Sequence, residues 1–211
     1  MRVIIIDYGM GNLQSIVNAL EHCGASPEIS DNPRDIIKME ALILPGVGAF
    51  ADGMKNLQSS GLDLAIKEAA TVRRIPLLGI CLGMQLLATW GFEGGEIPGL
   101  GLVAGEVRKL QPDNRDERIP HVGWNEVYYT RADPLVSAIP KGSDFYFVHS
   151  YHFMPRDQRD VVGVTPYCST IVSIVRHGTV WGVQFHPEKS SILGLTLLKN
   201  FLDICEEARS C

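Results

Sequence analysis

Cys81 stands in a short pattern whose residue types and spacing suit a nucleophile. Residues 79–83 read GICLG, an apolar run precedes them, and the helix-favouring segment 84–87 follows. The spacing G-x-C-x-G is the cysteine counterpart of G-x-S-x-G, in which a sharp turn from strand to helix exposes the reactive side chain. Small residues on either side let such a turn close against neighbouring backbone, and the helix start favours a thiolate and offers N–H groups to an oxyanion. The alternative is a buried core cysteine beside glycines that only connect a strand to a helix.

A base and a carboxylate to orient it occur together in residues 181–188, which read WGVQFHPE. If this segment stays extended, residues two apart point the same way, so His186 and Glu188 share a face while Pro187 fixes the backbone between them. A carboxylate beside an imidazole selects its tautomer and favours the imidazolium, as nucleophilic catalysis by a thiol requires. By itself, His-Pro-Glu at a strand end is also compatible with an ordinary loop. Together with the turn at Cys81 it indicates a Cys-His-Glu triad.

A glycine-rich turn supplies a third piece of the predicted site. Residues 42–50 read LILPGVGAF, so two glycines follow a strand-like run. Glycine lets backbone N–H groups come close to a substrate, and this turn therefore suits an oxyanion strand. A turn of this kind can equally serve only to redirect the chain.

The elements that position these residues follow from the apolar patterns of the first hundred residues. Three short apolar runs, 3–6, 41–44 and 77–80, each lead into a turn and then a segment of helical character. In the first of these units the apolar residues of 13–20 recur at helical spacing, and Gly24 stands where a helix stop is expected. Alternating buried strands and helices are typical of a parallel sheet flanked by helices, whose ligand sites lie at the carboxyl ends of the strands.

The second half of the chain has shorter runs separated by turns, which predicts mixed or antiparallel pairing. The expected strands are 106–110, 122–127, 145–148, 161–165, 171–176 and 180–184. A last helix, 192–208, carries apolar residues on one face and is expected to dock on the sheet. No Pro/Gly/Ser linker or charge run divides the two halves. We therefore predict that residues 1–211 form one α/β domain with a central, mostly parallel sheet flanked by helices.

The composition of the 211 residues fits a compact domain and excludes several function classes. Hydrophobic residues make up 45% and charged residues 20%, which fits neither a disordered nor a fibrous chain. The net charge of −5 offers nucleic acid or an anionic membrane little attraction, and no apolar run has the length of a membrane span or a signal peptide. The five cysteines are scattered without metal-ligand spacing. We therefore expect reduced thiols in the cytoplasm, no disulfide framework and no metal site.

Three of the segments above resemble the class I, triad-type glutamine amidotransferases. They are GICLGMQLL at 79–87, GVQFHPEKS at 182–190 and LPGVGAF at 44–50. The resemblance implies an α/β fold in which Cys81 is the nucleophile, His186 the general base and then acid, and Glu188 the residue that orients His186. Further motifs resemble the subgroup of glutaminase subunits that belong to imidazole glycerol phosphate synthases. These are DYGMGN at 7–12, PHVGWN at 120–125 and FYFVHSY at 145–151.

The resemblance also implies roles for residues around the nucleophile. It assigns the backbone N–H groups of Val47, Gly48 and Leu82 to the oxyanion. The residues that it implies for binding the glutamine substrate are Gly46, Gln85, Glu93, His149, Ser150 and Tyr151. Gln85 could instead be an ordinary residue of a helix surface, and His149 a hydrogen-bonded core histidine. Family members often carry Ser-Glu-Glu after the helix that follows the nucleophile, whereas this chain has GFE at 91–93.

The reaction that the resemblance implies is hydrolysis of L-glutamine to glutamate and ammonia, without a metal or an organic cofactor. A second catalytic domain does not fit into 211 residues, so the ammonia must be used by a partner. For this subgroup the partner is a (β/α)₈-barrel cyclase that acts on a phosphoribosyl substrate in histidine biosynthesis. Asn12, Trp124 and Lys189 match family positions near the subunit interface.

Two alternative functions remain open. One is a paralogous glutaminase subunit that supplies ammonia to a sugar in surface polysaccharide synthesis, with which the GFE segment is compatible. The other is a catalytically silent regulatory or binding subunit, which would be expected to lack one triad residue. All three triad residues are present.

Overall fold

Parallel pairing at the centre of the molecule arises from the apolar runs of the first half of the chain. In the computed structural model, which describes residues 1–113 and 117–209, these runs form β1 (Arg2–Ile6), β3 (Ala41–Leu44) and β4 (Leu77–Ile80). β1 pairs in parallel with β3, and β3 with β4. A further strand, β2 (Ser26–Ser30), pairs with β1 at the edge of the sheet. Its sequence SPEIS is polar and contains a proline, so the hydrophobic pattern does not predict it.

The second half of the chain extends the same sheet, which confirms a single α/β domain with a mixed second half. β13 (Val180–Val183) pairs in parallel with β4, so the segment before His186 lies next to the strand before Cys81. Four antiparallel strands follow: β12 (Ile171–His177), β11 (Val161–Thr165), β8 (His121–Tyr129) and β9 (Ser143–His149). The full order is β2-β1-β3-β4-β13-β12-β11-β8-β9.

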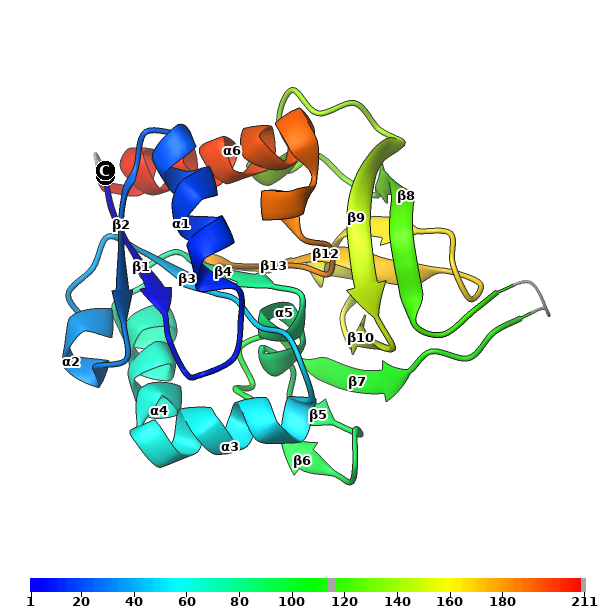
Figure 1. The fold of residues 1–211 in the computed structure, drawn as a ribbon, viewed down its shortest axis with the longest axis horizontal. Helices are drawn as coiled ribbons and strands as arrows, with labels where there is room; N and C mark the ends of the chain where they lie inside the picture. Colours follow the sequence, from blue (N-terminus) through cyan, green and yellow to red (C-terminus); the bar gives the residue numbers. More distant parts are fainter. Residues whose placement is uncertain (114–116, 210–211) are drawn as a thin grey trace.

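Helices cover both faces of the parallel part of the sheet (Figure 1). α1 (Leu13–His22) and α6 (Ser191–Arg209) pack on one face, with Val3 and Ile5 of β1. On the opposite face, with Ile4 and Ile6, pack α2 (Pro33–Ile36), α3 (Phe50–Ser60), α4 (Leu62–Lys67) and α5 (Leu82–Leu86). A π-helical turn, Glu68–Val72, continues α4. Because successive strand residues point to opposite faces, each apolar run contributes to two cores, and each large side chain buried there contributes about 1.5–3 kcal/mol.

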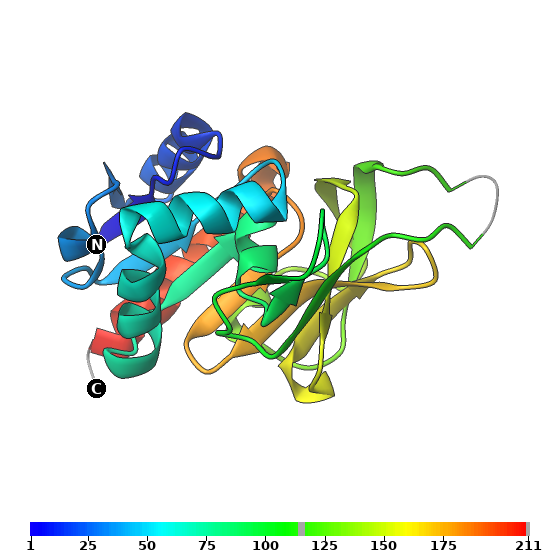
Figure 2. The same ribbon diagram turned by 90° about the horizontal axis from the view of Figure 1, so that it is seen from below.

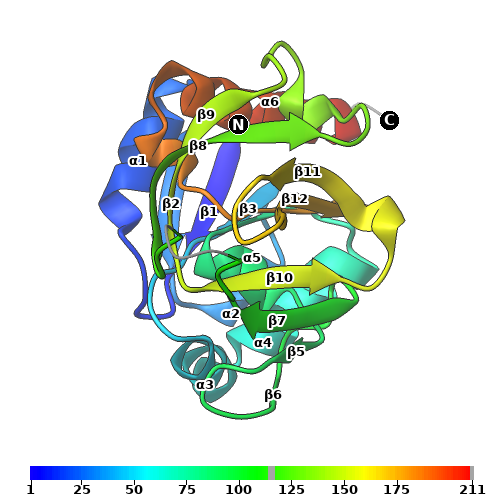
Figure 3. The same ribbon diagram turned by 90° about the vertical axis from the view of Figure 1, so that its right-hand side faces the viewer.

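A small second sheet forms one side of the β-rich end of the molecule (Figures 2 and 3). Its strands, in spatial order, are β10 (Tyr151–Pro155), β7 (Gly105–Lys109), β5 (Trp90–Gly91) and β6 (Ile97–Pro98). Short 3-10 turns at Pro134–Val136, Gln158–Asp160 and Pro187–Lys189 complete the described structure. The strand expected at 106–110 therefore belongs to this second sheet rather than to the central one.

Four cysteines, Cys23, Cys81, Cys168 and Cys205, are free thiols, and Cys211 lies outside the described residues. In the described part of the chain, none of the helices combines the length and apolar character needed to cross a bilayer.

Candidate active site

The turn at Cys81 joins β4 to α5 as its glycine spacing predicts. Cys81 is the N-cap residue of α5 and has φ +54° and ψ −110°. A Cβ at Gly79 would lie 2.7 Å from the Gly83 carbonyl oxygen, and a Cβ at Gly83 would collide with the Leu44 carbonyl oxygen. Only glycine fits at either position, because β4, α5 and β3 come together here with backbone against backbone. The side chain of Cys81 is thereby placed at the carboxyl end of the sheet.

His186 and Glu188 form a buried hydrogen-bonded pair. Nδ1 of His186 lies 2.8 Å from Oε1 of Glu188, and their side chains are 3% and 2% exposed. The expectation of an extended segment is wrong, since Pro187–Lys189 is a 3-10 turn that His186 precedes as N-cap. Proline at the first position of a turn favours this conformation, and the turn folds the carboxylate back onto the ring.

The pair favours a charged imidazole. Burial opposes protonation, but the side chains of Cys81 and Glu188 outweigh it and raise the pKa of His186 to about 9. Nε2 of His186 is buried and has no hydrogen-bond partner among the described residues. The Cys81 thiol donates instead to the Val148 carbonyl oxygen, at 3.8 Å. Cys81 and His186 thus interact electrostatically, without a hydrogen bond between them in this conformation.

The glycine turn after β3 lies against the nucleophile, but its geometry is not that of an open oxyanion hole. The backbone N–H of Leu82 donates to the Gly46 carbonyl oxygen at 3.3 Å, so one of the expected oxyanion donors is occupied. The buried hydroxyl of Tyr8 donates to the Pro45 carbonyl oxygen at 2.7 Å and holds the base of this turn. A Cβ at Gly46 would collide with that hydroxyl, which explains the glycine.

A cavity of about 280 Å³ opens beside Cys81 and gathers most of the residues expected to bind substrate. It is lined by Val47, Gly48, Cys81, Leu82, Gln85, Glu93, Pro120, Val148, His149, Ser150 and Tyr151. Gly46, which the resemblance assigns to substrate binding, is not among these lining residues. Oε2 of Glu93 accepts from the Phe50 N–H at 2.8 Å, so this carboxylate holds the start of α3 as well as facing the cavity. Gly91 has the ring of Phe50 packed against it, which leaves no space for a side chain. Both ends of the GFE segment therefore contact Phe50, Gly91 through its ring and Glu93 through its backbone N–H.

His149 is held by hydrogen bonds on both ring nitrogens. Nδ1 lies 2.8 Å from the Tyr151 carbonyl oxygen, and Nε2 lies 3.0 Å from Nδ1 of His121. Burial lowers the pKa of His149 to about 3 and that of His121 to about 4. Both rings are therefore neutral near pH 7, and His149 lines the cavity with both of its ring nitrogens already hydrogen-bonded.

Sequence reasoning missed Gln184, His121 and the cavity residues Val148 and Pro120. Gln184 carried a usable signal, because an amide inside an apolar strand segment must find hydrogen-bond partners when it is buried. His121 and Pro120 stand in the motif at 120–125, but only the pairing of β8 with β9 brings His121 to His149 and Pro120 to the cavity.

Two of the three expected interface residues lie together on the surface. Trp124 and Tyr146 make an edge-to-face contact with ring centroids 6.1 Å apart, and Nζ of Lys189 lies 5.9 Å from the centre of the same Tyr146 ring. Asn12 is exposed at the start of α1, beside Gly11, which packs near Pro45 at the glycine turn. Trp124 and Lys189 therefore share one patch through Tyr146, whereas Asn12 belongs to the neighbourhood of the glycine turn.

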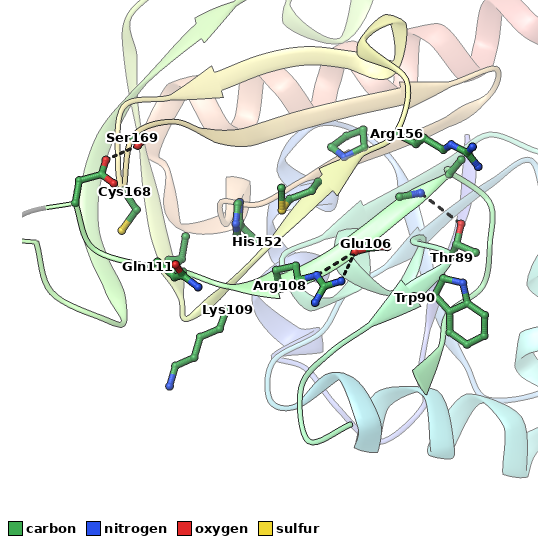
Figure 4. A pocket seen from close by; sticks show the side chains of 16 residues that line it. Thr89, Trp90, Glu106, Arg108, Lys109, Gln111, His152, Arg156, Cys168 and Ser169 are labelled. Atoms are coloured by element: carbon green, nitrogen blue, oxygen red, sulfur yellow. Dashed lines mark hydrogen bonds and ion pairs between the residues drawn. The ribbon is translucent and has the colours of Figure 1, made fainter. Parts of the chain in front are cut away.

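A larger cavity, of about 850 Å³, lies elsewhere, over the outer face of β7 and β10 (Figure 4). Some of its polar groups engage one another: Arg108 donates to Glu106 at 2.7 and 3.0 Å, and Ser169 donates to Asp113. It contains none of the triad residues. The smaller cavity, which Cys81 lines, is therefore the candidate active site.

Comparison with known proteins agrees with this geometry. The sequence model of the family described as glutamine amidotransferase class-I matches residues 4–205. The chain belongs to the class-I glutamine amidotransferases. Solved structures have the same fold, for example the glutaminase domain of Trypanosoma brucei CTPS, with a TM-score of 0.69 at 17% identity over 99% of this chain and 94% of the other.

Two similar class-I amidotransferases are named imidazole glycerol phosphate synthase subunit HisH. The protein from Moorella thermoacetica is 50% identical, covering 98% of this chain and 96% of its own length. One from Campylobacter jejuni, named HisH 1, is 46% identical and covers 94% and 98%. In this class-I amidotransferase, the described residues contain no group of three or more His, Cys, Asp or Glu side chains that could hold a metal ion.

Proposed function

We propose that residues 1–211 form one glutamine amidotransferase domain, and that this domain is the glutaminase subunit of an imidazole glycerol phosphate synthase. The observation that carries the reaction is the buried His186–Glu188 pair, which interacts with Cys81 at the edge of the smaller cavity. The relatives named for this synthase match over nearly the full length of both chains, which supports the subgroup. A catalytically silent subunit has no use for such a pair.

The proposed reaction proceeds in two halves. The Cys81 thiol passes its proton to His186, and its sulfur attacks the carboxamide carbon of glutamine. The C–N bond breaks as His186 gives that proton to the departing ammonia. A glutamyl thioester remains on Cys81. Water then attacks the thioester carbon while His186 accepts a proton from it, and the cysteine leaves as a thiolate. One glutamine and one water give one glutamate and one ammonia.

The cavity offers groups for the amino-acid end of glutamine. Both N–H bonds of the Gln85 amide are in use, toward Tyr151 and Gln184, so its oxygen is the atom left for the substrate ammonium. Glu93 and residues 149–151 line the same cavity. We assign Val47, Gly48 and Leu82 to the oxyanion, which requires the Gly46 carbonyl to leave the Leu82 N–H first.

We propose a (β/α)₈-barrel cyclase as the partner that uses the ammonia. The surface around the β8 strand supports a docking role, because Val122 and Trp124 are 56% and 54% exposed, beside Lys189. Exposed apolar side chains with a polar neighbour are typical of protein interfaces. The free thiols support our assignment of the complex to the cytoplasm.

The test is the Cys81→Ala variant in complex with a purified cyclase and its phosphoribosyl substrate. We expect glutamine-dependent synthesis to be lost while synthesis from added ammonium salt is retained, because only the first reaction uses the thiol. Equal loss of both activities would assign Cys81 to the fold or the interface. Full retention of glutamine turnover would remove it as the nucleophile.

A further inference from the structure

Gln184 is a fully buried amide that the triad mechanism does not use. It follows β13 directly and precedes His186 by two residues. Its Nε2 donates to Sγ of Cys81 at 3.8 Å, and its Oε1 accepts from Nε2 of Gln85 at 3.0 Å. Both ends of this amide are therefore engaged inside the site.

The orientation of the Gln184 amide follows from a single carbonyl. The Tyr151 carbonyl oxygen can only accept, so Gln85 must turn its NH₂ group toward it, at 2.8 Å. The same NH₂ group faces Gln184, so Gln184 must present its oxygen to Gln85. Its NH₂ group is then directed at the sulfur of Cys81.

A second chain of hydrogen bonds holds the same carbonyl from the other side. The Tyr151 oxygen accepts from Nδ1 of His149, which leaves Nε2 of His149 to accept from Nδ1 of His121. Nε2 of His121 then accepts from the side chain of Asn125, at 3.3 Å. The carbonyl that orients both glutamines is thus fixed by two neutral histidines, and the amide directed at the sulfur cannot turn over without breaking this arrangement.

We propose that Gln184 is a further catalytic residue, whose side-chain N–H stabilises the thiolate of Cys81. The proposal rests on Cys81 being the nucleophile of the proposed function. In the resting state the thiol donates to the Val148 carbonyl oxygen. Once the proton leaves, the sulfur can only accept, and the Gln184 N–H is a donor already in place. Hydrogen bonds to charged groups are stronger than those between neutral groups, so this contact favours the thiolate over the thiol.

The experiment measures alkylation of Cys81 by iodoacetamide as a function of pH in the full chain, with the modified peptide followed by mass spectrometry. Two variants are compared with wild type. Gln184→Met keeps the length of the side chain and removes the donor, and Gln184→Glu keeps the oxygen for Gln85 but places a second oxygen opposite the sulfur. Ser173→Ala is the matched control, since Ser173 is equally buried and its backbone carbonyl accepts from the backbone N–H of Gln184.

The alkylation midpoint is the pH at which Cys81 reacts at half of its maximal rate. We expect this midpoint to move upward by about one pH unit or more in Gln184→Met and further in Gln184→Glu, and to stay unchanged in Ser173→Ala. Glutamine turnover should fall about tenfold or more in both Gln184 variants, while ammonia-dependent synthesis by the complex is retained. An unchanged midpoint in both Gln184 variants would overturn the proposal. In the unmodified wild type, the side-chain NH₂ resonances of Gln184 should shift with pH at the same midpoint, and resonances that ignore the Cys81 titration would also overturn it.

Failure of the underlying function gives a different result. Wild-type protein fully alkylated at Cys81 would then still hydrolyse glutamine, whatever the behaviour of the Gln184 variants.

Discussion

Cys81 has a backbone conformation that a residue with a side chain adopts only when its surroundings enforce it. Strain of this kind costs on the order of 1–3 kcal/mol and concentrates at functional sites. Two backbone hydrogen bonds enforce it here. The Cys81 N–H donates to Val183 of β13 at 2.8 Å, and the Cys81 carbonyl accepts from Gln85 of α5 at 3.2 Å. The sheet and the helix thus hold the sulfur at the cavity from opposite sides.

The raised pKa of His186 predicts a pH-dependent contribution to stability. Between the ordinary value of about 6.5 and the folded value of about 9, the folded protein binds a proton that the unfolded chain does not. The free energy of unfolding gained from this group is therefore complete below pH 6.5 and is lost as the pH rises through about 9. Glu188→Gln removes the carboxylate that favours the charge, so its stability should vary less over this window.

Urea unfolding of the wild-type protein and of Glu188→Gln from pH 6 to 9.5 measures this difference in the pH dependence of stability. If the free energy of unfolding changed equally with pH in the two proteins, this would contradict the raised pKa of His186.

The activities of two variants test the roles of His186 and Glu188. His186→Ala should nearly abolish glutamine hydrolysis, by about a thousandfold or more. Glu188→Gln should reduce it less, because an amide still positions the ring in part. Normal accumulation of the glutamyl thioester in His186→Ala would contradict its role as the activating base.

At the scale of single residues, local spacing predicts the triad but not its surroundings. Cys81 and His186 could be found because the turn and the His-Pro-Glu segment are each short patterns. The hydrogen bonds of Gln184 and His149 could not, because their partners are distant in sequence and meet only through strand pairing.

Among the elements, the turn between β4 and α5 requires glycine at position 83 because of a close backbone contact, which helix and turn propensities do not describe. Gly83→Ala should destabilise the protein by about 3 kcal/mol or more, because its Cβ would collide with the Leu44 carbonyl and β3 cannot move without disturbing the sheet. Gly53→Ala in α3 is the control. There a Cβ would meet side-chain methyl groups, those of Leu86 at 3.2 Å and one of Leu82 at 3.5 Å, and alanine favours a helix.

Urea denaturation of the two variants provides the measurement, with a small effect expected for Gly53→Ala. A Gly83→Ala protein as stable as Gly53→Ala would show that the turn can widen without cost.

The predicted strands and their observed bounds agree where the pattern is apolar on both faces. Buried runs such as Ala41–Leu44 and Leu77–Ile80 form strands with the expected ends. The misses have two causes. β2 and β10 are polar or end in proline, and they are strands because a neighbouring strand offers them hydrogen bonds. The 3-10 turn after His186 escapes the sequence pattern because alternation assumes an extended chain.

The molecule as a whole brings the two halves of the chain to one active site through the pairing of β4 with β13. Cys81 leaves the first strand and His186 follows the second, so the reacting pair depends on contacts between residues about a hundred positions apart. The exposed face that carries Trp124 belongs to β8, and β8 also holds His121, which is hydrogen-bonded to the cavity wall. We therefore expect the proposed docking at this face to act on the cavity through one strand.

We expect the free protein to be a poor glutaminase, and the cyclase, more so with its ligand bound, to raise its rate. In the structure the Leu82 N–H is bonded to the Gly46 carbonyl, and loss of one oxyanion donor typically costs a factor of about 10²–10³. The glycines of this turn allow its peptide groups to reorient, and we expect a partner that contacts the neighbouring surface to stabilise the reoriented state.

The measurement is glutamate release by the free protein, by the protein with cyclase, and by the protein with cyclase and its ligand. Trp124→Ala should weaken the activation, whereas Met154→Ala, at a residue of similar exposure on the second sheet, should not. A free protein as fast as the liganded complex would show that the Leu82 contact opens without help.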